Sequence, residues 1–270
     1  MAFGITDSTY RYNQNTDIMN LFAHWEHHFK HNTSHFDHLS WTGKAELSEA
    51  EQQLIQHSLQ QFQRGENSEG KHLIQSARDY SALLGEESYL RTIVHFIKEE
   101  QRHALTLGRY MDLHEIPKIK SHWVDDVFRK LRQYTGPEYT IIILLTAELI
   151  AAVYYIALHN ATNSPLLQQI CQQILVDEQQ HIRFQAFTLR QLRSGQSSWS
   201  KRLSRSFQAL LLDATILLVW WQHQAVLSAG GFSFSIFRKM VKQEYRQAIK
   251  MIDGDVVARP TFIPSTQFSS

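Results

Sequence analysis

The chain has 270 residues, of which 43% are hydrophobic and 20% are charged, so it is long enough for one or two domains with a substantial core. Its formal net charge of +1 predicts no strong attraction to nucleic acid or anionic lipid. A single cysteine excludes an internal disulfide and a four-cysteine iron or zinc module. The amino-terminal residues show no basic start followed by an apolar stretch, so we expect no secretion signal and a cytoplasmic protein.

The apolar periodicity predicts an all-α fold along the whole chain. Glycine and proline are sparse, at 11 and 5 residues, as is typical of helical proteins. Ser48 followed by Glu51 is a capping-box pattern that begins a long helix, and residues 85–88 form the turn that ends it. The helices that we expect, in chain order, cover residues 17–31, 48–84, 88–114, 121–133, 137–160, 165–193, 201–228 and 233–252.

Two copies of the motif Glu-x-x-His dominate the sequence. Glu100 and His103 lie in the run IKEEQRHALTLGRYM, and Glu178 and His181 lie in the run ILVDEQQHIRFQAF. A spacing of three residues places a carboxylate and an imidazole on the same face of a helix. Glu148 lies 30 residues before Glu178 in a nearly apolar helical run, where a buried charge needs a metal ion or a partner.

Two glutamates compete for the equivalent place before the first motif. Glu66 and Glu69 lie 34 and 31 residues before Glu100 and fall on one helical stripe, so periodicity does not choose between them. Antiparallel helices joined by a short loop meet at equal distances from that loop, and Glu69 fits this register better. We therefore prefer Glu69 as a ligand and keep Glu66 as the alternative. His72, three residues after Glu69, is interpreted as a bystander on the helix surface.

The residue types suit a pair of metal ions with open coordination positions. Carboxylates are hard donors that can bridge two ions, and imidazole suits iron while tolerating manganese or zinc. Two histidines leave open positions, where dioxygen or peroxide binds to ferrous iron. We expect two iron ions, with manganese or a mixed pair as alternatives. The predicted ligands are Glu69 (or Glu66), Glu100, His103, Glu148, Glu178 and His181.

Three further residues are candidates near these ligands. Asp177 directly precedes Glu178 and is placed to orient a ligand histidine. Tyr155 and Tyr80 lie on helix faces that we expect to point into the bundle near the metals. Each is a candidate catalytic residue, which donates a hydrogen bond or is oxidised, and each is also compatible with a core aromatic whose hydroxyl is satisfied.

The six predicted ligands resemble those of the ferritin-like superfamily of carboxylate-bridged di-iron proteins, over residues of about 48–193. The pattern EEQRH…DEQQH is similar to that of soluble acyl-carrier-protein desaturases, rubrerythrins and bacterial di-iron oxidases. The resemblance implies a ferritin-like four-helix bundle over 48–193. It leaves an amino-terminal helix and irregular arm over 1–47 and carboxy-terminal helices over 201–270 that pack on the bundle.

The chain also departs from individual members of that superfamily. The second Glu-x-x-His is generally lacking in iron-storage ferritins, and the single cysteine excludes the rubredoxin module of rubrerythrins. Leu107 stands where the small subunit of ribonucleotide reductase carries its radical tyrosine. Ala151 and Ala152 stand where desaturases and bacterial monooxygenases place a threonine.

The expected function is a di-iron oxidase or monooxygenase that activates dioxygen and oxidises an apolar small molecule. Its electrons would come from a separate reductase or ferredoxin. One alternative is a metal-handling or peroxide-removing protein without an organic substrate, and another is a structural, partner-binding bundle. The apolar run at 207–227 is interrupted by Asp213, so we interpret it as a buried helix at a dimer interface or substrate channel. We expect no nucleic-acid partner and no membrane contact, and a homodimer is compatible with the sequence.

Overall fold

The structure is a computed structural model of the chain, which describes residues 22–34, 36–41, 47–67, 70–120, 130 and 136–255. Every regular element within these residues is a helix, so the all-α prediction is confirmed for them. The elements are α1 (Ala23–His31), the short 3₁₀-helix η2 (Asn32–Ser34), α2 (Glu49–Glu66), α3 (Lys71–Leu84), α4 (Ser88–Leu113), α6 (Pro137–Ala161), α7 (Pro165–Leu192), α8 (Ser198–Ala229) and α9 (Phe234–Asp253).

Helix starts follow the capping residues in the sequence. The Ser48 hydroxyl accepts a hydrogen bond from the Glu51 amide at 3.2 Å, as the capping-box pattern predicts. The Ser164 hydroxyl accepts from the amide of Leu167 at 3.4 Å at the start of α7. Proline occupies the first position of both α6 and α7, where its missing amide hydrogen has no helical partner to lose.

The single helix predicted over 48–84 is wrong. Helix α2 ends at Glu66 and α3 begins at Lys71. Gly70 lies between them with φ +66°, a left-handed conformation that favours glycine and interrupts a helix. A Cβ atom at Gly70 would lie 2.5 Å from Cδ1 of Ile97, so this turn is also packed closely against α4. The interruption changes the register of every residue that was placed by counting back from Leu84.

Two other predicted helices extend beyond the described residues. The amino-terminal helix was predicted over 17–31, and α1 covers Ala23–His31 of it, with 17–21 outside the described part. The helix predicted over 121–133 falls outside the described residues except for Lys130. The remaining helix boundaries differ from the predicted ones by a few residues at most.

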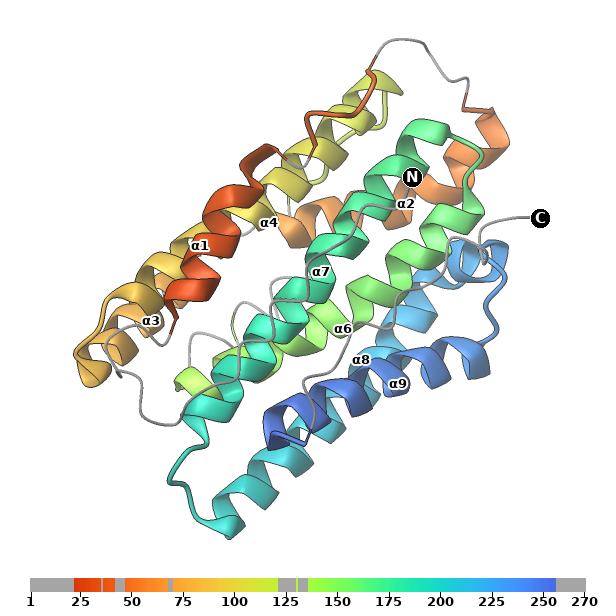
Figure 1. Cartoon of the computed structure of the whole chain (residues 1–270). Helices are drawn as coiled ribbons and strands as arrows, with labels where there is room; N and C mark the ends of the chain where they lie inside the picture. The colour runs from red at the N-terminus through yellow and green to blue at the C-terminus, as the bar shows by residue number, and fades with distance from the viewer. Residues whose placement is uncertain are drawn as a thin grey trace, which may run out of the picture.

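The long helices form a bundle with α6 near its centre (Figure 1). Helix α6 packs against α7 and α8, and α2 and α3 pack against α4. Helix α1 lies on α4 from the other side, and α9 packs mainly on α7. Most side chains of α6 are buried, which explains why this helix is apolar around its whole circumference. The bundle therefore holds Glu148 in its interior, where the sequence placed it.

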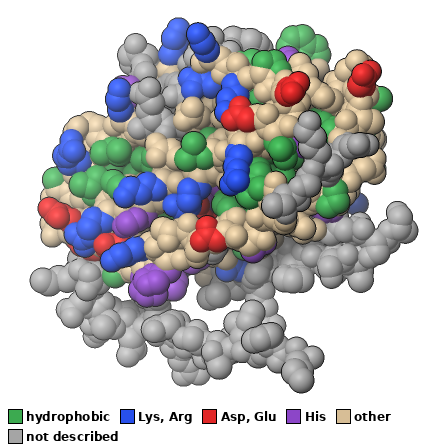
Figure 2. All heavy atoms as spheres, turned by 90° about the horizontal axis from the view of Figure 1, so that it is seen from above, with side chains coloured by type: hydrophobic (Ala, Val, Ile, Leu, Met, Phe, Trp, Pro, Cys, Tyr) green, Lys and Arg blue, Asp and Glu red, His purple; other side chains and the backbone are tan. Residues whose placement is uncertain are grey.

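Helix α8 is buried on one face only, which corrects the expectation that the run at 207–227 is a buried helix. Leu212 and Ile216 face the bundle, whereas Leu210, Leu217 and Trp221 are 71%, 60% and 72% exposed. Helices α6 and α8 are both long and apolar enough to cross a bilayer by length and composition alone, and α6 meets this test as a core helix. On the face seen in Figure 2, hydrophobic side chains share the surface with lysine and arginine side chains.

Candidate metal centre

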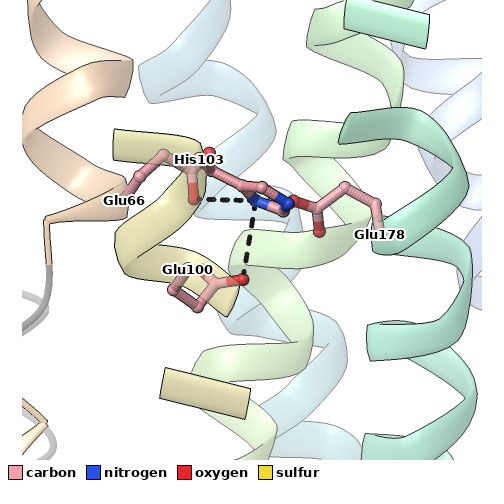
Figure 3. A group of neighbouring side chains, drawn as sticks. All are labelled: Glu66, Glu100, His103 and Glu178. Atoms are coloured by element: carbon pink, nitrogen blue, oxygen red, sulfur yellow. Dashed lines mark ion pairs between the residues drawn. The ribbon is translucent and has the colours of Figure 1, made fainter. Parts of the chain in front are cut away.

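Carboxylate and imidazole side chains from four helices meet inside the bundle. They form three groups, in each of which the candidate ligand atoms lie within 4.8 Å of one another. The third group, Glu99, His103 and Asp177, contains the acids that lie behind the ligand histidines, and the first and second hold the predicted ligands. Glu100 on α4 and Glu178 on α7 belong to both the first and the second group, so these two groups share two carboxylates. Figure 3 shows the first group, with carboxylates from three helices around one imidazole. The first group is Glu66, Glu100, His103 and Glu178, and the second is Glu100, Glu148, Glu178 and His181.

Three carboxylates surround the Nδ1 atom of His103. The Oε2 atom of Glu66 and the Oε1 atom of Glu100 each lie 3.9 Å from it, and Oε1 of Glu178 lies 3.7 Å from it. These distances exceed those of a hydrogen bond, and they leave room for an ion between the atoms. The side chain of His103 is fully buried.

The second group repeats the arrangement around His181. Its Nδ1 atom lies 2.9 Å from Oε1 of Glu100, 3.7 Å from Oε2 of Glu148 and 3.5 Å from Oε2 of Glu178. The two oxygens of Glu178 therefore face different histidines, Oε1 toward the first group and Oε2 toward the second. A carboxylate in this position can bridge two ions, with one oxygen on each.

The ligand atoms are buried, and although Nδ1 of His181 lies 2.9 Å from Oε1 of Glu100, none of them has a hydrogen bond of good geometry among the described residues. This holds for Nδ1 of His103, Nδ1 of His181, Oε1 of Glu100 and both carboxylate oxygens of Glu178. An unpaired buried polar atom is destabilising, and a cluster of them in one place requires an explanation. Two divalent cations would satisfy all of these atoms and would balance the charge of the four carboxylates, so the residues present fit a pair of metal ions.

A second carboxylate lies behind each ligand histidine. Oδ2 of Asp177 lies 3.1 Å from Nε2 of His103, and Oε1 of Glu99 lies 3.7 Å from Nε2 of His181. Each of these acids directly precedes the glutamate of the opposite motif, so the pairing crosses between α4 and α7. Such a carboxylate fixes the imidazole tautomer and leaves Nδ1 directed at the metal. Asp177 was predicted for this role; Glu99 was missed, although an acidic residue before each motif glutamate is a visible signal.

The outer carboxylate Glu99 is also tied to the amino-terminal part of the chain. The Asn32 side-chain amide donates to Oε1 of Glu99 at 3.4 Å, and the Arg102 guanidinium donates to its Oε2 at 3.4 Å. Asp177 in turn accepts a hydrogen bond from Gln173 at 3.1 Å. Both acids are therefore held in place, but only Asp177 is within hydrogen-bond distance of its histidine.

The two glutamates that belong to only one of the first two groups are held by neutral hydrogen-bond donors. The Tyr155 hydroxyl donates to Oε1 of Glu66 at 2.6 Å, and the Gln185 side-chain amide donates to Oε1 of Glu148 at 2.8 Å. Burial and the nearby Glu66 carboxylate raise the pKa of Tyr155 well above its usual value, so its hydroxyl remains a donor. Gln185 was missed, although it lies four residues after His181 on the same face of α7.

Glu66 occupies the place for which Glu69 was preferred, and Glu69 lies outside the described residues. The register argument that favoured Glu69 assumed one continuous helix up to Leu84, and the break after α2 removes that assumption. The same assumption underlies the placement of Tyr80. Its ring packs edge-on against Tyr89 at 5.1 Å, between α3 and α4, and its role near the metals stays a prediction.

Burial and neighbouring charges shift the pKa values of the clustered side chains, so that some of them keep a proton at neutral pH. Burial, followed by repulsion from Glu148, raises the pKa of Glu100 to about 8. Burial alone would lower the pKa of His103, but the interactions with Asp177, Glu66 and Glu100 together outweigh it and raise that pKa to about 10. Burial would raise the pKa of Glu148, but contacts with Glu178 and His181 outweigh it and keep it at about 2. Metal ions that bind at neutral pH must therefore displace protons from these ligands.

Comparison with known proteins assigns no family to the chain. No protein-family model, no curated protein and no solved structure matches it. The observations that point to a function are therefore the ligand types, their burial and the distances between them.

We expect Asp177→Asn to weaken metal binding beside His103. An asparagine keeps the size of the side chain but removes the negative charge that fixes the imidazole, so affinity for one of the two ions should fall roughly 10–100-fold. Competition against a coloured chelator measures this affinity. Asp79→Asn, a change at an exposed aspartate on α3, is the matched control and should bind both ions as the parent does. Equal affinities in the parent and Asp177→Asn would contradict the prediction.

Proposed function

We propose that this protein is a di-iron oxidase or oxygenase that consumes dioxygen and oxidises an organic substrate with electrons from a separate donor. The observation that carries the proposal is the pair of buried ligand groups that share Glu100 and Glu178. A closed structural zinc site is commonly formed by four Cys or His ligands around one ion. Two linked groups, each with three carboxylates and a single imidazole, resemble the di-iron sites of ferritin-like bundles instead.

Each of the six side chains would hold one or both of the two ions. Glu100 and Glu178 would bridge them, Glu66 and His103 would complete one site, and Glu148 and His181 the other. Bound iron supplies the change of oxidation state and the open coordination positions at which dioxygen reacts. Tyr155 holds Glu66 through its hydroxyl, which donates to Oε1 and would leave Oε2 to hold an ion.

The ligand side chains differ in solvent exposure, and this difference indicates where a small molecule would enter. The Glu100 side chain is 13% exposed, whereas the side chains of His103, Glu178 and His181 are fully buried. Dioxygen and substrate would therefore approach along α4, beside Glu100. Beside His181, apolar side chains pack against the centre: the rings of Phe96 and Phe29 lie 4.8 and 5.8 Å from that of His181. A closed apolar lining excludes water from a reactive centre.

Metal analysis combined with oxygen uptake tests this function. Protein purified from iron-rich medium should contain about two iron ions per chain. The reduced, iron-loaded protein should consume dioxygen, and a suitable donor and organic substrate should make that consumption continue over many turnovers. Iron binding with a single, stoichiometric oxidation and no turnover would favour metal handling instead. Protein that binds neither iron nor manganese would contradict the proposal and leave a structural bundle.

A further inference from the structure

A second buried polar chain lies beside the candidate centre, between α2, α6 and α8. The Ser58 hydroxyl lies 2.9 Å from the Tyr154 hydroxyl and 2.7 Å from Nδ1 of His223. All three side chains are buried, and Tyr154 is completely so. None of the three is a predicted metal ligand, and the function proposed above uses none of them.

The three groups form a continuous path for a proton. A serine hydroxyl has one hydrogen to donate and can accept another, so it can stand between a donor and an acceptor. In the structure the Ser58 hydroxyl donates to the Tyr154 oxygen, and two hydroxyls exchange these roles by rotating their O–H bonds. In the reversed arrangement the phenol of Tyr154 donates to Ser58, and the hydrogen of Ser58 is directed at Nδ1 of His223. The neutral imidazole is a base that can accept this proton near neutral pH. Burial raises the pKa of Tyr154 far above its usual value, so the phenol does not lose its proton by simple ionisation.

Aromatic contacts connect Tyr154 with a ligand of the candidate metal centre. Its ring lies 5.3 Å from that of Tyr155, whose hydroxyl donates to Glu66 at 2.6 Å. The ring of Phe62 stacks on Tyr154 with an interplanar angle of 2° and meets the edge of Tyr155 at 5.8 Å. Phe62 also contacts the His223 ring, at 5.1 Å, and so closes the group on that side. Electron transfer across these contacts requires no movement of the chain.

We propose that Tyr154 is a redox-active tyrosine that donates one electron to the oxidised metal site, with Ser58 and His223 as the path for its proton. This inference depends on the di-iron function proposed above. The O–H bond of Tyr154 breaks and its proton moves to Ser58, while the proton of Ser58 forms an N–H bond on His223. One electron reduces the metal site by one unit. The products are a neutral tyrosyl radical and an imidazolium, so charge and atoms balance.

Tyr154 suits this role better than its neighbour Tyr155. An oxidised phenol must release its proton, and the hydroxyl of Tyr155 faces Glu66, whose carboxylate would be engaged with a metal ion. The hydroxyl of Tyr154 instead leads to an imidazole through a single serine. Tyr154 thus has contact with the centre on one side and a proton acceptor on the other.

Freeze-quench electron paramagnetic resonance tests the proposal. Iron-loaded, reduced protein is mixed with dioxygen or hydrogen peroxide, and iron content is measured for every variant. The parent should give a tyrosyl radical whose formation is slower in deuterium oxide. Tyr154→Phe should lose the signal, and Ser58→Ala and His223→Phe should slow its formation. Tyr110→Phe, which removes the hydroxyl of another fully buried tyrosine, should keep the signal.

The outcomes separate this proposal from the function on which it depends. A radical that persists in Tyr154→Phe, or iron that binds and is oxidised without any radical in the parent, would overturn the role of Tyr154 and leave the di-iron function standing. A parent protein that binds no iron would overturn both. Thermal unfolding of each variant shows whether it is folded, and Tyr155→Phe reports separately on the contact with Glu66.

Discussion

Replacing Glu178 with glutamine should stabilise the metal-free protein and remove its stabilisation by metal. Glu178 is fully buried, and burial together with repulsion from Glu148 raises its pKa well above the usual value. Between its unfolded and folded pKa values this carboxyl takes up a proton on folding, which a glutamine does not need. We expect the metal-free variant to gain about 1–3 kcal/mol in the free energy of unfolding, or roughly 2–4 °C per kcal/mol in Tm.

The sign of the effect depends on pH. A carboxyl with a raised pKa in the folded state destabilises the protein above its unfolded pKa of about 4.3 and stops doing so below it. The gain from glutamine should therefore be present at neutral pH and disappear below about pH 4, where the parent is protonated in both states. This pattern differs from that of an ordinary core substitution, whose effect does not follow the titration of a carboxyl.

Metal should act in the opposite direction. Ions that bind only the folded parent raise its Tm by mass action, and the variant lacks the carboxylate that serves both ions, so its Tm should not respond. Thermal unfolding with and without ferrous iron, at several pH values, measures both effects. Glu87→Gln, at an 81% exposed side chain at the start of α4, should behave as the parent does. A variant less stable than the parent without metal, or equally stabilised by iron, would contradict the prediction.

Gly230→Ala should strongly destabilise the protein through the contact between α8 and α6. A Cβ atom at Gly230 would lie 2.3 Å from the carbonyl oxygen of Ala157 and 2.8 Å from its carbonyl carbon and Cα. All three are backbone atoms of α6, which cannot move aside as the end of a side chain can. We expect a loss of about 2–4 kcal/mol, which lowers Tm by roughly 5–10 °C in a thermal-unfolding measurement.

A second glycine provides the matched control for this prediction. A Cβ atom at Gly65, within α2, would meet nothing within 4 Å. Gly65→Ala should therefore leave stability unchanged or raise it by about 0.5–1 kcal/mol, since alanine has the higher helix propensity. Equal effects at Gly65 and Gly230 would show that helix propensity, and not the close approach of α8 to α6, controls both.

Local spacing explains why most of the candidate centre could be predicted from the sequence. Glu100 with His103, and Glu178 with His181, share a helix face through a spacing of three residues, whatever the rest of the chain does. Glu148 was recognisable because a charge is rare within so apolar a helix. These ligands needed only helix geometry and a hydrophobic pattern.

The remaining features depend on tertiary packing, which the sequence pattern does not contain. Whether Glu66 or Glu69 enters the centre depends on where the helix stops, and that depends on the left-handed Gly70 and its fit against Ile97. The role of Glu99 depends on how the His181 imidazole of α7 faces α4 across the bundle. The exposed face of α8 could not be predicted, because the sequence of an apolar helix does not show whether neighbouring helices cover one of its faces or all of them.

The position of Glu66 at the very end of α2 gives this ligand a property that the other five lack. Glu100, His103, Glu148, Glu178 and His181 have helical turns before and after them, so their backbone is restrained from both directions. Glu66 is restrained from one direction only, because the regular hydrogen bonding of α2 stops there. If the six side chains hold metal ions as proposed, Glu66 is the ligand whose backbone could shift most readily to change its contact with an ion.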